Sequence, residues 1–195
     1  QLSDGSWQYV EDNQPVTGWK SIHSTWYYFN SDGIMVTGWF KDGGYWYYLK
    51  SSGAMATGWV QVDGNWYYLK EDGRMATGWL KLGNVWYYLK SNGIMATGWL
   101  QEGSTWYYLY DWGGMANTSW VQVNGSWYYF RGNGAMATGW LQLGSTWYYL
   151  KSSGAMATGW NWIGNNCYYF NQSGKMAANT TVGGYKLDAT GAWVK

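Results

Sequence analysis

Tryptophan recurs in this chain at a spacing that could place its rings as the walls of a binding site. Fifteen of the 19 tryptophans belong to two series with a period of twenty residues, which a one-residue insertion shifts once. The first series is Trp19, Trp39, Trp59, Trp79, Trp99, Trp120, Trp140 and Trp160, and the second is Trp26, Trp46, Trp66, Trp86, Trp106, Trp127 and Trp147, followed by Cys167. The face of an indole ring attracts cations, at about 0.5–2 kcal/mol per contact. Boxes of such rings indicate sites for a cation that cannot form hydrogen bonds, above all a quaternary ammonium ion.

Two other uses of the rings stay open at this point. Aromatic side chains also stack on sugar rings, and they can simply fill the core of a repeat protein. A core of this kind does not require tryptophan, because Leu, Val and Ile fill such gaps without a bulky ring.

Residues 58–78 show which element would hold the rings. Residues 59–62 alternate in polarity and favour a strand, Asp63-Gly64 is a strong hairpin signal, and residues 65–69 form the returning strand. The expected cross-strand pairs are Val62 with Asn65, Gln61 with Trp66, Val60 with Tyr67, and Trp59 with Tyr68. One face then carries Trp59, Trp66 and Tyr68, and the other carries Val60, Val62, Tyr67 and Leu69.

A hairpin that is apolar on both faces needs a cover on both, and the next copy of the repeat supplies it. We therefore predict an all-β solenoid of about nine stacked hairpins, with the loop methionine Met75 filling the gap between two of them. We expect a single module over residues 1–195. It has an atypical first repeat at 1–18, regular repeats at 19–178 with an insertion near 111–119, and a terminal cap at 179–195.

The composition argues against several functions. Only 12% of the residues are charged and the net charge is +1, so the basic surface that binds nucleic acid is missing and we expect no such partner. No stretch approaches the ~18 apolar residues of a membrane span, and we expect none. Cys167 is the only cysteine and His23 the only histidine. We therefore expect no disulfide, metal site, cofactor or catalytic set, and no enzyme activity.

The segments TGWVQVDGNWYYLKEDGRMATGW and TGWLQLGSTWYYLKSSGAMATGW resemble choline-binding repeats, and the resemblance extends from about Trp7 to the end of the chain. These repeats occur in autolysins, phage lysins and surface adhesins of streptococci and their phages. The resemblance implies a left-handed β-solenoid and recognition of choline and phosphocholine on teichoic and lipoteichoic acids. It also implies an extracellular location at the bacterial cell wall or surface.

The same resemblance implies sites built from two Trp of one repeat and a Tyr of the next, often with a Met. The second Tyr of each pair is the expected one, because it shares the tryptophan face, and the first Tyr is the alternative. The expected sites are Trp19, Trp26 and Tyr48; Trp39, Trp46 and Tyr68; Trp59, Trp66 and Tyr88; Trp79, Trp86 and Tyr108; Trp120, Trp127 and Tyr149; and Trp140, Trp147 and Tyr169. The methionines assigned to them are Met55, Met75, Met95 and Met156.

We expect two junctions to depart from this pattern. The group of Trp99, Trp106 and Tyr129 straddles the insertion, which is expected to disturb it. Trp160 faces Cys167 in place of a second Trp, so the last site is expected to be lost or altered. Two further functions stay open: a carbohydrate-binding repeat of similar sequence, and an adhesin that contacts a host protein through the outer face of the solenoid. A host protein could also be a partner of a domain outside this sequence.

Overall fold

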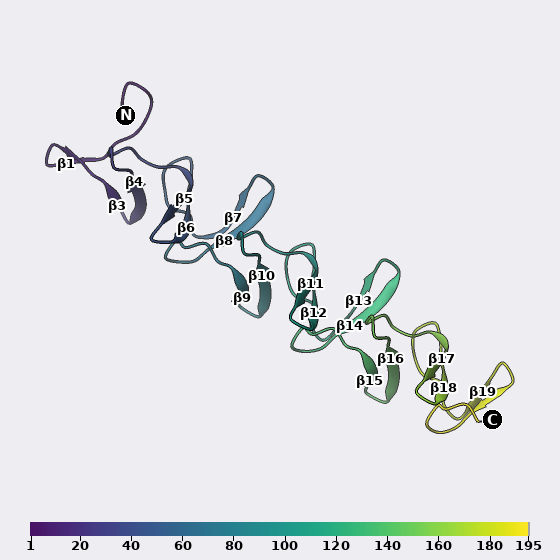
Figure 1. Cartoon of the computed structure of the whole chain (residues 1–195). Coiled ribbons are helices and arrows are strands. Elements are labelled where there is room, and N and C mark those ends of the chain that lie inside the picture. Colours follow the sequence, from purple (N-terminus) through teal and green to yellow (C-terminus); the bar gives the residue numbers. More distant parts are fainter. Residues whose placement is uncertain (195) are drawn as a thin grey trace. The chain divides into compact units, whose positions relative to one another are not determined.

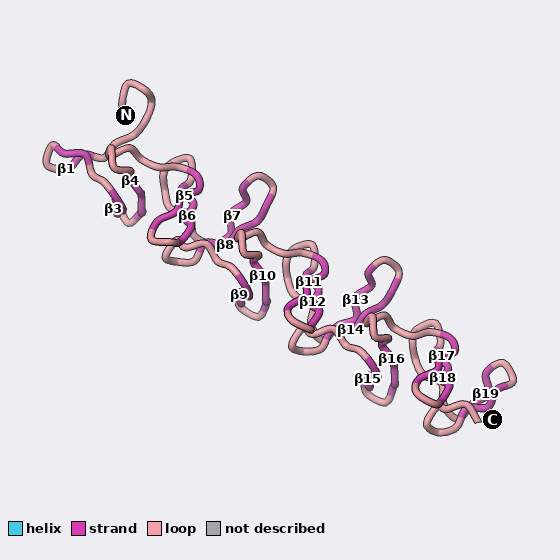
Figure 2. The backbone as a smooth tube through the Cα atoms, viewed as in Figure 1, coloured by secondary structure: helices cyan, strands magenta, loops and turns pink. Residues whose placement is uncertain are grey.

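The computed structural model describes residues 1–194 and, in this range, consists of β-hairpins joined by loops, with no helix (Figures 1 and 2). Contacts divide the chain into two compact units, one of residues 1–96 and one from Thr97 onward, and each is described by itself. The prediction of an all-β chain of stacked hairpins is confirmed. Residues 1–194 contain ten strand pairs rather than about nine, because short hairpins form near both ends of this range.

The first unit holds five two-stranded hairpins in sequence order. Their strands are β1 (Val10–Glu11), β2 (Gln14–Pro15), β3 (Gly18–Ile22), β4 (Thr25–Phe29), β5 (Gly38–Asp42), β6 (Tyr45–Leu49), β7 (Gly58–Val62), β8 (Asn65–Leu69), β9 (Gly78–Leu82) and β10 (Val85–Leu89).

The second unit repeats this arrangement with five more hairpins. Their strands are β11 (Gly98–Glu102), β12 (Thr105–Leu109), β13 (Ser119–Val123), β14 (Ser126–Phe130), β15 (Gly139–Leu143), β16 (Thr146–Leu150), β17 (Gly159–Ile163), β18 (Asn166–Phe170), β19 (Thr180–Val182) and β20 (Tyr185–Leu187).

The register of the β7–β8 hairpin is the one that the sequence predicts. Trp59 pairs with Tyr68, and Gln61 pairs with Trp66. At the turn Asp63 and Gly64 have φ angles of 49° and 77°. Positive φ at both central residues defines the turn type whose twist matches the two strands, and Asp-Gly adopts it readily. The Asp-Gly dipeptide therefore sets the register, which places both tryptophans of the repeat on one face.

Within each unit the loop after a hairpin attaches to the hairpin before it. The backbone N–H of Met75 donates a hydrogen bond of 2.8 Å to the carbonyl oxygen of Trp46, and Met156 bonds to Trp127 at the same distance. The prediction that a loop methionine fills the gap between hairpins is confirmed for Met75, because its sulfur lies against Gly93 in the next loop.

The core is a series of small clusters, one for each hairpin. The last residue of the second strand is fully buried in the regular repeats, as Leu69 and Leu150 show with 0% exposure. Leu150 packs with Leu141 of the neighbouring strand and Ala137 of the preceding loop, and Trp120 of the preceding hairpin covers this cluster. Each hairpin thus depends on its neighbour for a complete core, as expected for a repeat protein.

The insertion does not interrupt the hairpins of the second unit. In regular repeats a glycine with positive φ starts the first strand, such as Gly139 at 75°, whereas Ser119 starts β13. Thr118, just before it, has a φ of 43°. One extra residue thus supplies the left-handed turn one position earlier, and β13 pairs with β14 in the usual register.

Candidate functional site

In several hairpins the two tryptophans stand nearly at right angles to each other. The rings of Trp19 and Trp26 are 6.5 Å apart at 81°, and those of Trp140 and Trp147 are 6.0 Å apart at 89°. Both residues of each pair come from neighbouring positions on one face of the hairpin, which follows from the register. They form two walls that meet at a corner.

The next hairpin supplies a third wall through the first tyrosine of its Tyr-Tyr pair. The ring of Tyr47 lies 4.9 Å from that of Trp19 at 61°, and the ring of Tyr168 lies 4.8 Å from that of Trp140 at 77°. The same contact recurs at the other junctions within the units, for Trp39–Tyr67, Trp59–Tyr87, Trp99–Tyr128 and Trp120–Tyr148.

Four of these corners open into cavities of similar size, which are named here by their first tryptophan. Their volumes are about 380 Å³ for the Trp19 pocket, 410 Å³ for the Trp99 pocket, 390 Å³ for the Trp120 pocket and 460 Å³ for the Trp140 pocket. The aromatic lining and methionine of each are Trp19, Trp26, Tyr47 and Met55; Trp99, Trp106, Tyr128 and Met136; Trp120, Trp127, Tyr148 and Met156; and Trp140, Trp147, Tyr168 and Met176.

The second tyrosine, which we expected in these sites, lies elsewhere. The ring of Tyr149 packs at 5.3 Å on Trp140 of its own hairpin, and that of Tyr68 packs at 5.2 Å on Trp59. The other second tyrosines of the prediction make the same contact within their own hairpins: Tyr48 with Trp39, Tyr88 with Trp79, Tyr108 with Trp99, and Tyr169 with Trp160. The placement of the second tyrosine is therefore corrected to the first, which was the alternative.

The physical reason lies in how the hairpins stack. The prediction that the second tyrosine shares the tryptophan face of its own hairpin is confirmed, since Trp59 and Tyr68 are cross-strand partners. In a head-to-tail stack, however, the tryptophan face of one hairpin meets the opposite face of the next. The first tyrosine lies on that opposite face, because adjacent strand residues point to opposite sides.

The methionines agree with the prediction better than the tyrosines do. Met55 and Met156 line the Trp19 and Trp120 pockets as predicted, and the structure adds Met136 and Met176, which the prediction omitted. Met75 and Met95 bond through their backbone N–H groups to Trp46 and Trp66, as Met55 does to Trp26. The twenty-residue period alone could have identified all of them.

The remaining predicted groups fall into two cases. Trp39 and Trp46 belong to one hairpin, as do Trp59 and Trp66, and the tyrosines that meet Trp39 and Trp59 are Tyr67 and Tyr87. Tyr108, predicted to join Trp79 and Trp86, packs on Trp99 of its own hairpin instead, and a site at Trp79 and Trp86 stays a prediction.

The insertion leaves the Trp99 pocket in place, contrary to expectation. Trp99 and Trp106 are 6.1 Å apart at 85°, and Tyr128 closes the corner at 4.8 Å. Tyr129, the residue first assigned here, packs on Trp120. The extra residue lies before β13, and it therefore shifts the sequence numbers without changing the junction.

A loop two hairpins further along the chain forms the rim of each pocket, and its charge varies. The rim residues are Glu71 and Asp72 at the Trp19 pocket, Ser152 and Ser153 at the Trp99 pocket, Gln172, Ser173 and Lys175 at the Trp120 pocket, and Ala189 and Thr190 at the Trp140 pocket. A further carboxylate approaches the Trp19 pocket, where the indole N–H of Trp19 donates a 3.0 Å hydrogen bond to Oδ2 of Asp42. The aromatic walls are thus alike, while the electrostatic environment is not.

The last junction holds a smaller cavity of about 240 Å³, here called the terminal pocket. Its lining consists of Trp160, Trp162, Cys167, Tyr185 and Trp193. Cys167 occupies the place of the second tryptophan and is 7% exposed. The lining of this junction is altered, and its use as a binding site stays a prediction.

The pockets contain walls for a cation but few groups for chemistry. Among the residues that the structure describes, no group of three His, Cys, Asp or Glu side chains could hold a metal ion. No helix in the same range is long and apolar enough to cross a membrane.

Comparison with known proteins agrees with this geometry. One family model of the choline-binding repeat matches residues 16–57, 56–89, 76–120 and 117–158. A second model of the choline-binding repeat matches residues 161–193. No curated protein sequence matches the chain. The chain belongs to the choline-binding repeat family, whose known role is attachment to the choline of teichoic acids.

Solved structures of Streptococcus pneumoniae proteins show the same fold. CbpJ from strain TIGR4 is 44% identical over 97% of this chain and 76% of that chain, with a TM-score of 0.91. The choline-binding domain of CbpL is 40% identical over 92% of this chain and 98% of that chain, with a TM-score of 0.70. CbpF in complex with ipratropium is 35% identical over 97% and 76% of the two chains, with a TM-score of 0.82.

Proposed function

We propose that each pocket between successive hairpins binds one choline head group, and that the chain attaches to a choline-bearing polymer through several pockets at once. The observation that carries this proposal is the corner of two perpendicular indoles closed by a tyrosine, as at Trp140, Trp147 and Tyr168. Three ring faces directed into one cavity suit a cation whose methyl groups pack on the rings. The trimethylammonium group has both the charge and the apolar surface that such walls accept.

Attachment at several pockets explains how weak single sites could hold a protein firmly. Choline has few atoms, so one pocket gains little free energy of binding. Teichoic and lipoteichoic acids carry many cholines, and joining several weak sites on one chain raises the apparent affinity by about 10²–10⁴. The proposed partner is therefore phosphocholine on these polymers, and the proposed location is the bacterial cell wall or surface.

We also propose that this chain acts by binding alone, without catalysis. Its pockets are lined by aromatic rings and methionine, and the rim groups vary from one pocket to the next. General acid–base catalysis needs titratable side chains held within hydrogen-bonding reach of the reacting bond. Among the described residues, the pockets share no such pair of side chains. Any catalytic activity on the wall would then belong to a domain outside this sequence.

The proposal is tested by retention on beads that carry phosphocholine. We expect the chain to bind these beads, to be released by free choline, and to remain bound in glucose or isomaltose. The variant Trp147→Ala should bind less tightly, whereas Gln142→Ala should not, because Gln142 is the cross-strand partner of Trp147 but lies outside the lining. Release by the sugars and not by choline would replace this function with the carbohydrate-binding alternative.

A further inference from the structure

The terminal pocket contains an exchange of residues across the last complete hairpin. Trp162 and Cys167 are cross-strand partners in β17–β18. In the preceding hairpin the same two positions hold Gln142 and Trp147. The indole has thus moved from the second strand to the first. Directly paired residues share a face and have Cβ atoms about 4.5–5.5 Å apart, so the ring still begins on the side of the hairpin that faces the pocket.

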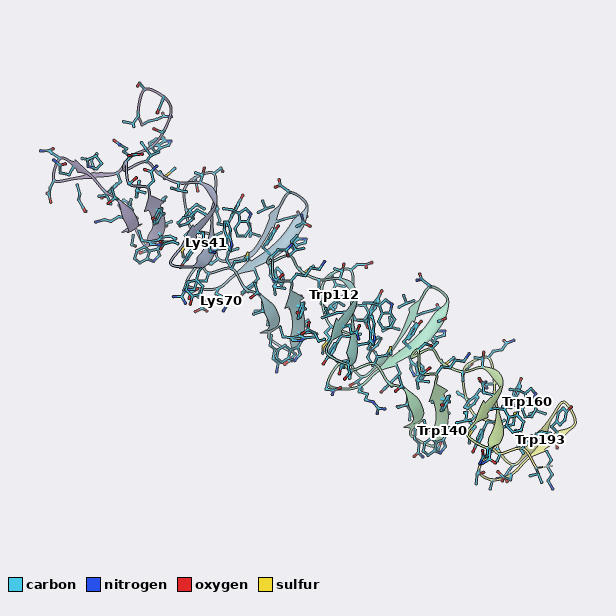
Figure 3. The ribbon with its side chains drawn as sticks, in the orientation of Figure 1. Lys41, Lys70, Trp112, Trp140, Trp160 and Trp193 are labelled. Atoms are coloured by element: carbon cyan, nitrogen blue, oxygen red, sulfur yellow. The ribbon has the colours of Figure 1, made fainter. Side chains whose placement is uncertain are left out.

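A second exchange adds another ring. In the Trp140 pocket Met176 attaches through its N–H group to the carbonyl oxygen of Trp147, at 2.9 Å. In the terminal pocket Trp193 makes the equivalent 2.8 Å bond to the carbonyl oxygen of Cys167. Trp193 therefore occupies the methionine position, and it lies with Trp160 beside the last hairpin (Figure 3).

The result is a cavity with four aromatic walls. The ring of Tyr185 is 5.5 Å from that of Trp160 and 5.3 Å from that of Trp193, and Trp162 is 6.3 Å from Trp193 at 72°. Tyr185 takes the place that the first tyrosine has in the other pockets. Three indoles and one phenol thus replace the two indoles, phenol and thioether of the Trp140 pocket.

These rings are too exposed to be read as a sealed core. Trp162 is 61% exposed and Tyr185 is 49% exposed. Large apolar side chains that remain open to water and converge on one hollow mark a binding site more often than a packing element. Cys167, in contrast, is almost fully buried and forms the floor where the usual second indole begins.

The size and lining of the cavity restrict its ligand. At about 240 Å³ it is smaller than the roughly 300–1,000 Å³ of pockets that hold drug-sized molecules. None of its lining residues carries a fixed charge, so a charged ligand would be stabilised by the ring faces. A compact quaternary ammonium group meets both conditions, whereas a sugar would find few hydrogen-bonding partners.

We propose that the terminal pocket binds a quaternary ammonium head group, with Trp162 replacing the second tryptophan that Cys167 removes. The inference rests on the proposed function, because it extends choline binding to a junction that lacks the usual Trp, Trp and Tyr set. It makes Trp162 and Trp193 binding residues that the repeat pattern does not identify.

The test is a crystal structure of the full chain soaked in choline, followed by two variants. Trp162→Gln installs the residue found at positions 122 and 142. The double variant Trp162→Gln with Cys167→Trp moves the indole back to its usual strand. Because Trp162 is exposed, replacing it should change the stability of the fold little, and choline in the Trp140 pocket of the same crystals confirms that each variant is folded.

We expect choline between Trp160, Trp162, Tyr185 and Trp193 in the unaltered chain. Occupancy of this pocket should fall at least several-fold in Trp162→Gln and return in the double variant, while the Trp140 pocket stays filled throughout. Choline in the other pockets but never in this one would overturn the inference alone, as would equal occupancy in Trp162→Gln. If the double variant did not regain choline, the proposal that Trp162 takes over the role of a tryptophan at position 167 would be wrong. Choline in none of the pockets would instead contradict the proposed function.

Discussion

The sulfur of Met55 lies against the α-carbon of Gly73, so closely that a Cβ at position 73 would overlap it. Met55 lines the Trp19 pocket, and Gly73 belongs to the loop that supplies the pocket's rim, Glu71 and Asp72. The glycine of one repeat therefore holds in place the methionine of the repeat before it. Three successive repeats are needed to complete one pocket.

This contact predicts a binding defect in Gly73→Ala. Its φ is 80°, and that of Gly64 is 77°, where an added Cβ would meet nothing within 4 Å. Alanine at either position bears the cost of a left-handed conformation, about 1–2 kcal/mol. Only Gly73→Ala adds the overlap with Met55, about 1–3 kcal/mol of overpacking.

The measurement is a thermal melt of both variants together with choline titration of the Trp19 and Trp26 indole N–H signals by NMR. We expect Gly73→Ala to melt at a lower temperature than Gly64→Ala and to weaken choline binding at these two tryptophans. Equal melting temperatures and equal titrations would show that Met55 moves aside without consequence.

The assignment of the first tyrosine is testable at the Trp120 pocket. Tyr148 is a wall of this pocket, while the adjacent Tyr149 packs on Trp140. Tyr148→Leu should weaken choline binding at Trp120 and Trp127 by roughly 2- to 30-fold, the range for loss of one cation–π contact. Tyr149→Leu is the matched control and should leave these two signals unchanged. A larger effect of Tyr149→Leu at the same signals would restore the second tyrosine as the binding residue.

The unequal rims predict that the pockets differ in their preference for phosphate. Lys175 at the Trp120 pocket should favour phosphocholine over choline. At the Trp19 pocket Glu71 and Asp72 should favour choline, although Arg74, whose Nε lies 3.4 Å from Oδ2 of Asp72, offsets part of their charge. Lys175→Ala, which installs the residue found at position 155, should reduce the phosphocholine preference of the Trp120 pocket by a few-fold.

The converse change is made at the Trp19 pocket. Replacing both Glu71 and Asp72 with serine reproduces Ser152 and Ser153 of the Trp99 pocket. We expect phosphocholine to bind the Trp19 pocket more tightly in this variant, and added salt to diminish the difference. Identical ratios of the two ligands at every pocket, with and without these changes, would rule out a role for the rim.

Asp188 makes the last loop sensitive to acid. Its Oδ1 accepts hydrogen bonds from the backbone N–H of Thr190 at 2.8 Å, from the hydroxyl of Thr190 at 2.7 Å and from the N–H of Ala192 at 3.0 Å. The hydrogen bond from the Thr190 side chain is the main cause that holds the pKa of Asp188 below its ordinary value of 3.8. Because the pKa is lowered by folding, ionised Asp188 stabilises the folded loop fully above pH 3.8, its ordinary value. This contribution to the stability of the loop is lost as the pH falls through the lower pKa of the folded state.

Amide hydrogen exchange at Thr190 and Ala192 measures this effect. Protection should decrease below the ordinary pKa of Asp188 in the unaltered chain. Asp188→Asn keeps an acceptor, as Asn171 does for the N–H groups of Ser173 and Lys175, and should remove the acid-dependent part. If the variant lost protection along the same pH curve, Asp188 would not be the group responsible.

The hairpins could be predicted from sequence because their determinants are local. The Asp63-Gly64 turn specifies the register, and the register decides which residues share a face. The choice of tyrosine could not be predicted in this way. Tyr67 and Tyr68 are adjacent, and which of them meets the preceding hairpin depends on how two hairpins stack, a relation that no single repeat contains.

The two irregular junctions differ from expectation to different extents. At Trp99 the extra residue is absorbed before β13, where Thr118 takes the positive φ, so an insertion in a loop left the junction intact. At Trp160 the altered lining follows from Cys167, but the pocket also depends on the cross-strand partner of Cys167, Trp162, which the prediction did not include. The signal was present in the sequence, since position 162 holds a tryptophan where positions 122 and 142 hold glutamine.

We propose that these pockets bind choline through its positive charge. The most direct test compares choline with 3,3-dimethyl-1-butanol, which has the same shape but carbon in place of the charged nitrogen, by calorimetric titration of the full chain. We expect saturable binding of several cholines per chain and an affinity for the neutral analogue lower by more than the roughly 2- to 30-fold of a single cation–π contact, because the charge meets three rings in each pocket. Equal affinity for the two compounds would show that the aromatic walls act by apolar contact alone. The absence of choline binding would contradict the proposed function altogether.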